Sequence, residues 1–146
     1  MQSDTVRQEM RRKIKDAVSR QDAGAVVRGG RDLLDASGKP ADAMFCVSAF
    51  ADIADAMKKQ LGTRRLRAYV VRSVTVEPIL PFLATEAVLS NYFLDIEMGG
   101  YGSYIDEMLS PQSRLGKFNP DVVLVRTDLE EIAGRVTQAC AGGIFG

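Results

Sequence analysis

The sequence of 146 residues contains no histidine and no tryptophan. Without histidine, the chain cannot build a Ser-His-Asp triad, a Cys-His pair or a histidine-ligated metal site from its own residues. Its two cysteines, Cys46 and Cys140, lie far apart with no CxxC spacing, which argues against a zinc knuckle and a disulfide framework. No apolar stretch reaches the roughly 18 residues of a membrane-spanning helix, and the charged N-terminal segment lacks the apolar run of a signal peptide. These absences predict a soluble, cytoplasmic protein.

Charge is balanced overall, with 19 Lys and Arg against 19 Asp and Glu, but it is divided along the chain. Residues 1–67 carry 14 basic and 9 acidic side chains, whereas residues 68–146 carry 5 and 10, so the halves have net charges of +5 and −5. A basic half can attract an acidic partner. The cluster of Arg11, Arg12, Lys13 and Lys15 is read first as a solvated helix face and, alternatively, as a surface that steers an acidic carrier protein. Nucleic acid is disfavoured because no aromatic residues are interleaved with these charges, and no membrane partner is expected.

Three amphipathic segments predict an antiparallel helical array over residues 1–62. The first has a capping box at Thr5 and Gln8, the second begins at the cap residue Asp22, and the third begins near Pro40. Gly38 and Pro40 end the second segment, and Leu61-Gly62 ends the third. The predicted inward stripes are Val6, Met10, Ile14, Ala17 and Val18; Val26, Gly30, Leu33 and Leu34; and Met44, Val47, Ala51 and Ala54, with Phe50 beside the last.

Strands and helices alternate in the pattern of residues 63–146. We predict strands at Ala68–Val71, Tyr92–Met98 and Val122–Val125, helices at Pro78–Asn91, Ser103–Leu109 and Leu129–Ala141, and a loop from Pro111 to Pro120. This order favours an α/β fold in which the helical array is followed by a small three-layer lobe with a parallel sheet. Three strands leave a bare sheet edge, so the lobe is expected to be incomplete or to be covered by another chain, for example in a homo-oligomer.

Polar residues follow each predicted strand and define a candidate crevice for a ligand or partner. Its residues are Ser73, Thr75 and Glu77 after the first strand, Gly99 and Gly100 after the second, and Asp128 after the third. The carboxyl ends of adjacent parallel strands meet at one sheet edge, where a small polar or anionic group could bind near the free amides of the helix that begins at Pro78. The simpler alternative is that Ser73 or Thr75 caps that helix.

Metal and cofactor sites are not expected in this chain. The candidate carboxylate pairs are Asp52 with Asp55, Asp106 with Glu107, and Glu130 with Glu131. Without histidine or a flanking DxD spacing, each pair is better explained as a solvated helix face.

Four motifs between Leu66 and about Val125 resemble the N-terminal region of FkbH-like proteins, the HAD-IIIC family. They are Ser-x-Thr-x-Glu-Pro at 73–78, Gly-Gly-Tyr-Gly-Ser-Tyr-x-x-Glu-Met-Leu at 99–109, Pro-x-Ser-x-Leu at 111–115 and Phe-x-Pro-Asp-Val-Val at 118–123. The resemblance implies an SGNH-hydrolase-like α/β lobe preceded by helices and followed by a HAD phosphatase domain. It also implies participation in loading a glyceryl unit onto an acyl carrier protein in polyketide-type biosynthesis.

The departures from the family pattern shape the expected function. No Asp-x-Asp-x-Thr/Val motif occurs, so the HAD nucleophile and its Mg²⁺ site are absent from this chain. Ser73 occupies the place of an SGNH nucleophile but follows Arg72 rather than Gly-Asp. We therefore expect a recognition and positioning domain, inactive alone, whose partners are an acyl carrier protein or a following HAD domain. The alternatives are an SGNH-like or flavodoxin-like enzyme completed by residues outside this chain, and a non-catalytic dimerisation module.

Overall fold

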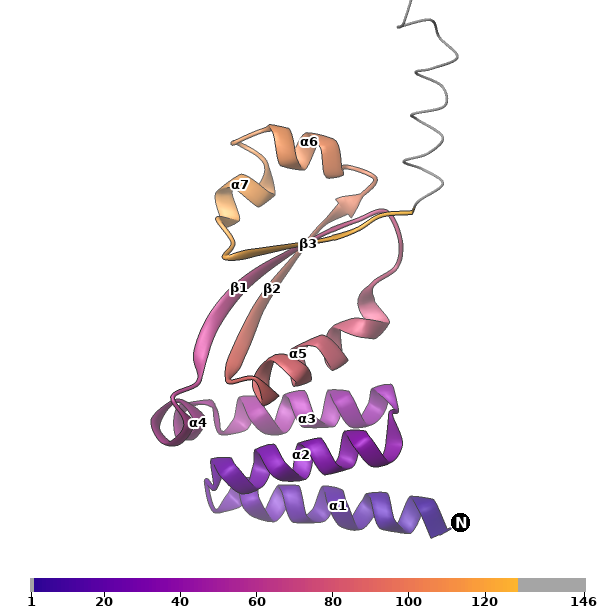
Figure 1. Cartoon of the computed structure of the whole chain (residues 1–146), viewed down its shortest axis with the longest axis vertical. Coiled ribbons are helices and arrows are strands. Elements are labelled where there is room, and N and C mark those ends of the chain that lie inside the picture. The colour runs from indigo at the N-terminus through magenta and orange to yellow at the C-terminus, as the bar shows by residue number, and fades with distance from the viewer. Residues whose placement is uncertain (1, 129–146) are drawn as a thin grey trace, which may run out of the picture. The chain divides into compact units, whose positions relative to one another are not determined.

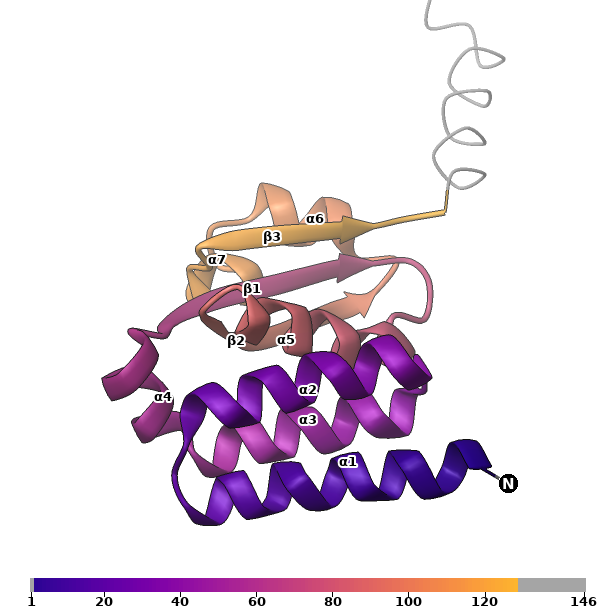
Figure 2. The same cartoon turned by 60° about the horizontal axis from the view of Figure 1, so that its bottom comes forward.

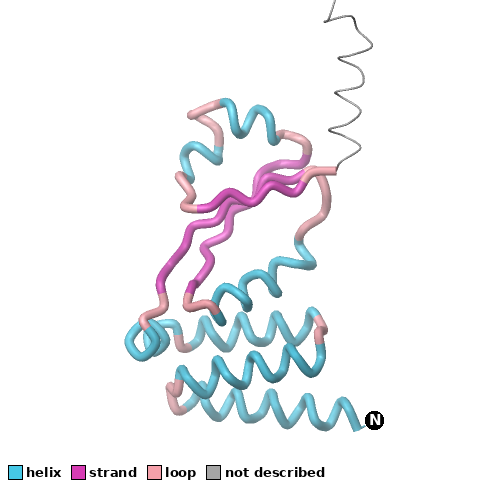
Figure 3. Tube along the Cα trace, viewed as in Figure 1, coloured by secondary structure: helices cyan, strands magenta, loops and turns pink. Residues whose placement is uncertain are grey.

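The computed structural model describes residues 2–128, and their packing forms two compact units. The first contains residues 2–66 and 77–94, and the described part of the second contains residues 67–76 and 95–128. Helices and a small parallel sheet confirm the α/β class with an N-terminal helical array (Figure 3). Residues 77–94 group with the helices, and the folding of 1–62 as a domain by itself stays a prediction.

Helices make up nearly all of the first unit. They are α1 (Gln2–Ser19), α2 (Ala23–Ser37), α3 (Pro40–Asp52), α4 (Ala54–Leu61) and α5 (Leu80–Leu89), with a short 3-10 turn, η1 (Glu77–Ile79), before α5. Figures 1 and 2 show α1, α2 and α3 as adjacent antiparallel rods, with α5 lying against α3. The predicted array is therefore present.

Both ends of α2 follow the predicted cap chemistry. The Asp22 carboxylate accepts a hydrogen bond of 2.9 Å from the amide of Ala25, which would otherwise lack a partner in the first turn. At the other end, Gly38 adopts the left-handed conformation (φ 57°), and its amide donates to the carbonyl of Leu34. Short-range signals thus mark both ends of this helix.

Two adjacent glycines let α2 approach its neighbours closely. A Cβ on Gly29 would lie 2.8 Å from Cγ1 of Ile14 in α1, and one on Gly30 would lie 2.8 Å from the Phe50 ring in α3. Larger residues at these positions would push the helices apart. The core between the helices consists of Ile14, Ala17, Ala23, Val26, Leu33, Cys46, Ala49, Phe50, Ile53, Met57 and Val88.

Several sequence expectations for the helices were wrong. Val6, predicted to lie on the inward stripe of the first helix, is 53% exposed. Thr5 is an exposed residue inside α1, which begins at Gln2, so the Thr5–Gln8 capping box does not start the helix. Met44 is 61% exposed and Ala51 is exposed too, and the buried apolar stripe of α3 passes instead through Ala43, Cys46, Ala49 and Phe50. The third segment is two helices, because the backbone leaves helical geometry at Ile53 (φ −121°, ψ 24°).

The sheet has the order β2-β1-β3, and its strands are β1 (Arg64–Arg72), β2 (Tyr92–Tyr101) and β3 (Val122–Arg126). β1 pairs in parallel with β3, from Ala68 opposite Val122 to Arg72 opposite Arg126 (Figure 2). The side chains of Ala68–Val71 are buried, as a central strand requires. The carboxyl ends of adjacent strands therefore meet at one edge, as predicted.

The lobe also departs from the predicted boundaries. β1 begins at Arg64, and β2 continues through Gly99 and Gly100 to Tyr101, so these glycines belong to the strand and not to the loop after it. The helices α6 (Tyr104–Leu109) and α7 (Arg114–Phe118) follow β2, and α7 lies within the segment predicted as a loop. The helix predicted at Leu129–Ala141 and Cys140 lie outside the described residues.

Candidate functional site at the carboxyl ends of the strands

The structure joins Ser73 and Asp128 directly. Ser73 follows β1, and its Oγ accepts a hydrogen bond of 2.8 Å from the backbone amide of Asp128, which follows β3. The amide of Ser73 also donates to the carbonyl of Arg126 at 3.0 Å. Two predicted crevice residues thus lie together, and the serine hydroxyl connects the two strand ends.

Arg72 is the residue at this edge that the sequence analysis did not include among the crevice residues. Its side chain is buried, and its Nε donates to the carbonyl of Gly99 at 3.2 Å. One Nη donates to the Tyr101 hydroxyl at 3.2 Å, and the guanidinium lies 4.1 Å from the centre of the Tyr101 ring. In the sequence, Arg72 directly follows the apolar run Ala68–Val71, and arginine is rarely buried. This charged residue at the end of an apolar strand could have marked Arg72 as a candidate site residue.

Gly99 and Gly100 have separate structural roles. A Cβ at Gly99 would lie 3.2 Å from the ring of Tyr69, so the glycine permits the tight contact between β2 and β1. The carbonyl of Gly100 accepts a hydrogen bond from the Ser103 hydroxyl at 3.2 Å, which closes the turn before α6. Both glycines therefore lie at this sheet edge.

Thr75 and Glu77 are exposed, and only Thr75 belongs to the same unit as Ser73. The helix predicted to begin at Pro78 is a 3-10 turn there, and α5 begins at Leu80 with Ile79 as its N-cap. Ile79 provides no side-chain cap bond, so neither Ser73 nor Thr75 is the N-cap residue of α5.

A buried tyrosine in β1 links the sheet to the helices that follow β2. Tyr69 is fully buried in β1, and its hydroxyl donates to the Glu107 carboxylate at 2.9 Å. Burial, together with this carboxylate, raises the pKa of Tyr69 to about 12. The same carboxylate oxygen accepts from the amide of Leu115 at 3.1 Å, so Glu107 joins β1, α6 and the start of α7.

The segment around α7 is held by local capping. The Ser113 hydroxyl accepts from the amide of Gly116 at 3.1 Å and donates to the carbonyl of Glu107 at 2.7 Å. A Cβ on Gly116 would overlap the carbonyl of Pro111. Asp121 then pairs with the backbone of Arg67 at the start of β3. The motif residues that carry the family resemblance thus make the contacts that shape this unit.

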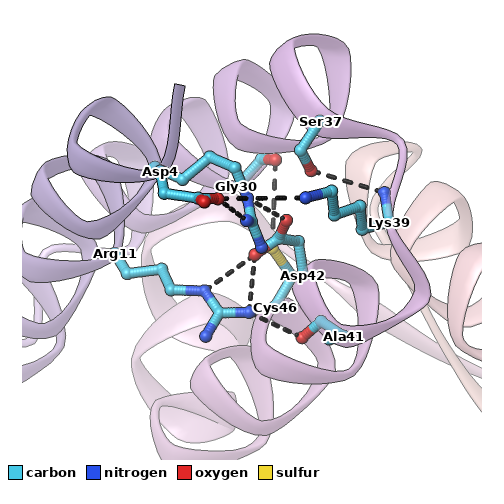
Figure 4. A network of polar contacts seen from close by, with 9 residues as sticks. Asp4, Arg11, Gly30, Ser37, Lys39, Ala41, Asp42 and Cys46 are labelled. Atoms are coloured by element: carbon cyan, nitrogen blue, oxygen red, sulfur yellow. Dashed lines mark hydrogen bonds and ion pairs between the residues drawn. The ribbon is translucent and has the colours of Figure 1, made fainter. Parts of the chain in front are cut away.

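A second polar cluster lies in the helical unit and centres on Asp42, in the first turn of α3 (Figure 4). This carboxylate is fully buried. Arg7 donates to its Oδ2 at 2.9 Å, and Arg11 donates from Nε to its Oδ1 at 2.7 Å. Arg11 also reaches the carbonyl of Ala41, so two arginines of α1 attach to the start of α3.

The charge on Asp42 is stabilised by these donors. Burial alone would raise its pKa, but hydrogen bonds from Arg7, Ser37 and Arg11 outweigh burial and lower the pKa to about 2. The position in the first helical turn favours a negative charge as well. Asp42 is therefore ionised throughout the physiological range, and its role is to hold helices together.

Three of the four basic residues proposed to steer a partner make contacts within the chain, and the Lys15 ammonium lies 6.0 Å from the centre of the Phe45 ring. Arg11 binds Asp42 and lies 5.0 Å from the Phe45 ring, while Arg12 pairs with Glu9 at 2.7 Å. Lys13 and Lys15 are exposed. The basic face of α1 is thus partly neutralised by its own neighbours.

Within residues 2–128, no group of three or more potential ligands is arranged to hold a metal ion. Asp52, Asp55 and Asp106 are exposed, Glu107 binds Tyr69, and Glu130 and Glu131 lie outside the described residues. Cys46 is buried, and burial raises the pKa of its thiol to about 11. Over the same residues, no helix combines the length and apolar character needed to cross a membrane.

Comparison with known proteins shows a partial likeness to a solved structure. No family model matches the sequence, and no curated protein matches it. Among solved structures, the chain is similar to the crystal structure of the N-terminal part of the protein BF1531 from Bacteroides fragilis, which contains a phosphatase domain complexed with Mg. The identity is 15% and the TM-score 0.46, over 51% of this chain and 20% of that one. The match therefore spans about a fifth of that structure.

Proposed function

We propose that this chain is a non-catalytic recognition and positioning domain of an FkbH-like protein that loads a glyceryl unit onto an acyl carrier protein. Ser73 supports the non-catalytic part of this proposal. Its hydroxyl, which the family resemblance assigns to the position of an SGNH nucleophile, accepts a hydrogen bond from the backbone amide of Asp128 and so connects two strand ends. A nucleophilic serine needs a base to take its proton, and the chain has no histidine for that role.

The charge distribution supports recognition of an acidic protein. The first 67 residues carry a net charge of +5, and complementary charge accelerates the encounter with an acidic partner. Such an encounter weakens as salt screens the charges. The family resemblance supplies the identity of that partner, an acyl carrier protein.

Titration of the acyl carrier protein from the same pathway into the purified chain, at low and high salt, tests the proposal. We expect a complex whose affinity falls with salt, and no steady hydrolysis of an aryl phosphate or an aryl acetate by the chain alone. Absence of binding at low salt would overturn the recognition role. Hydrolysis that persists through repeated purification and resists a chelator would overturn the non-catalytic role.

A further inference from the structure

We propose that the junction of α4 and β1 is the docking site for the acidic partner. A pocket of about 510 Å³ lies there, lined by Lys58, Gly62, Thr63, Arg64 and Arg65, which we call the basic pocket. All five residues belong to the first unit. The inference rests on the proposed function only for the identity of the partner.

Positive charge is concentrated around the basic pocket. Four cations, Lys58, Lys59, Arg64 and Arg65, occur between residues 56 and 66, and this segment contains no Asp or Glu. All four side chains are exposed, and none of them forms an ion pair within the described part of the chain. Arg11 and Arg12 of α1, by contrast, have carboxylate partners.

The partial charge at the end of a helix explains the presence of only two of these four cations. Lys58 and Lys59 occupy the last turn of α4, where cations interact favourably with the partial negative charge of the helix end. Arg64 and Arg65 begin β1, so that explanation does not apply to them. Their presence beside the lysines leaves a surface that a negatively charged molecule can neutralise.

Backbone hydrogen bonds in the basic pocket make an acidic protein surface a better occupant than a small anion. The amide of Gly62 donates to the carbonyl of Lys58, and the amide of Arg64 donates to the carbonyl of Asn91. Two backbone donors that could hold a phosphate are therefore already used. Long, exposed cationic side chains remain, and these suit a salt-dependent contact with several carboxylates of a partner.

Charge-reversal variants test this location. The double variant Lys58→Glu/Arg65→Glu reverses two charges in the basic pocket. The control variant Lys13→Glu/Lys15→Glu reverses two charges on α1. Thermal unfolding of both variants checks that they fold as the parent chain does. The binding probes are the acyl carrier protein of the pathway in its apo and holo forms, a poly-glutamate peptide and inorganic phosphate.

We expect the basic-pocket variant to bind the carrier and poly-glutamate about tenfold or more weakly than the parent chain does, with an affinity that depends less on salt. The α1 variant should have a smaller effect on both affinities. Equal effects of the two variants, or a larger effect on α1, would overturn the inference and leave the proposed function intact. Pocket-dependent binding of poly-glutamate without binding of the carrier would support the docking site and overturn the proposed function. Binding of phosphate alone, or of the holo carrier but not the apo carrier, would show that the site binds a phosphate group and would overturn the inference. Failure of every probe to bind would also overturn it.

Discussion

Replacement of Asp42 by asparagine removes the charge that holds α1 to the start of α3. Arg7 and Arg11 would then face a neutral amide, in which an NH2 group replaces one of the two oxygens that now accept from the guanidinium groups. The pKa of Asp42 is lowered from 3.8 to about 2, and at about 1.4 kcal/mol per pKa unit this corresponds to about 2–3 kcal/mol of stability near neutral pH. The exposed fractions of the Arg7 and Arg11 side chains, 17% and 32%, allow partial rehydration, so we expect a loss nearer 2 kcal/mol.

The pH dependence follows from the direction of this shift. A carboxyl group with a lowered pKa in the folded state stabilises the fold fully above its unfolded pKa of about 3.9. The contribution of Asp42 is then lost as the pH falls from about 4 toward 2. The difference between the parent chain and Asp42→Asn should therefore be largest near neutral pH and should shrink in acid.

Urea unfolding monitored by far-UV circular dichroism measures this difference at neutral pH and at stepwise lower pH. Asp32→Asn, at an exposed position on α2, is the matched control and should change stability by less than about 0.5 kcal/mol. Equal stability of Asp42→Asn and the control at neutral pH would refute the role of the buried carboxylate. A loss that stays constant down to acid pH would refute the contribution of its charge.

Three further substitutions test contacts in the second unit. Gly116→Ala should cost about 1–3 kcal/mol in chemical denaturation because the new methyl overlaps the backbone of Pro111, and unchanged stability would contradict that packing. Tyr69→Phe should cost about 1–2 kcal/mol by removing the bond to Glu107. The difference between the ultraviolet titrations of the parent chain and of Tyr69→Phe should show the Tyr69 phenol ionising near pH 12. The stabilisation from this phenol is then lost between about pH 10 and 12, and a difference that titrates near pH 10 would contradict its burial. Ser73→Ala should cost about 0.5–1.5 kcal/mol in thermal unfolding but leave glyceryl transfer intact in the longest natural form of the protein, whereas lost transfer at unchanged stability would show a direct role in the site.

Local chemistry was sufficient to predict several elements of the fold. The Asp22 cap and Gly38 predicted the bounds of α2, and the apolar run from Val122 to Val125 predicted β3, because each signal acts within a few residues. The parallel pairing of β1 and β3 followed from the alternation of strands and helices.

The remaining features depend on contacts that local patterns do not contain. Small and apolar residues cover much of α3, so more than one helical stripe was possible, and packing against α2 selected the stripe through Cys46. The short α7 depends on the Ser113 cap and on the bond from Leu115 to Glu107. The partners Arg11 and Asp42 are 31 residues apart, so the sequence could not show that this arginine is already neutralised.

The kinetics of glyceryl loading by the longest natural form of the protein test the central claim most directly. A docking surface whose contacts with the carrier are made equally in the ground state and the transition state should affect KM. We predict that Lys58→Glu/Arg65→Glu raises the KM for the carrier protein by about tenfold and leaves kcat unchanged. A fall in kcat at unchanged KM would contradict the account.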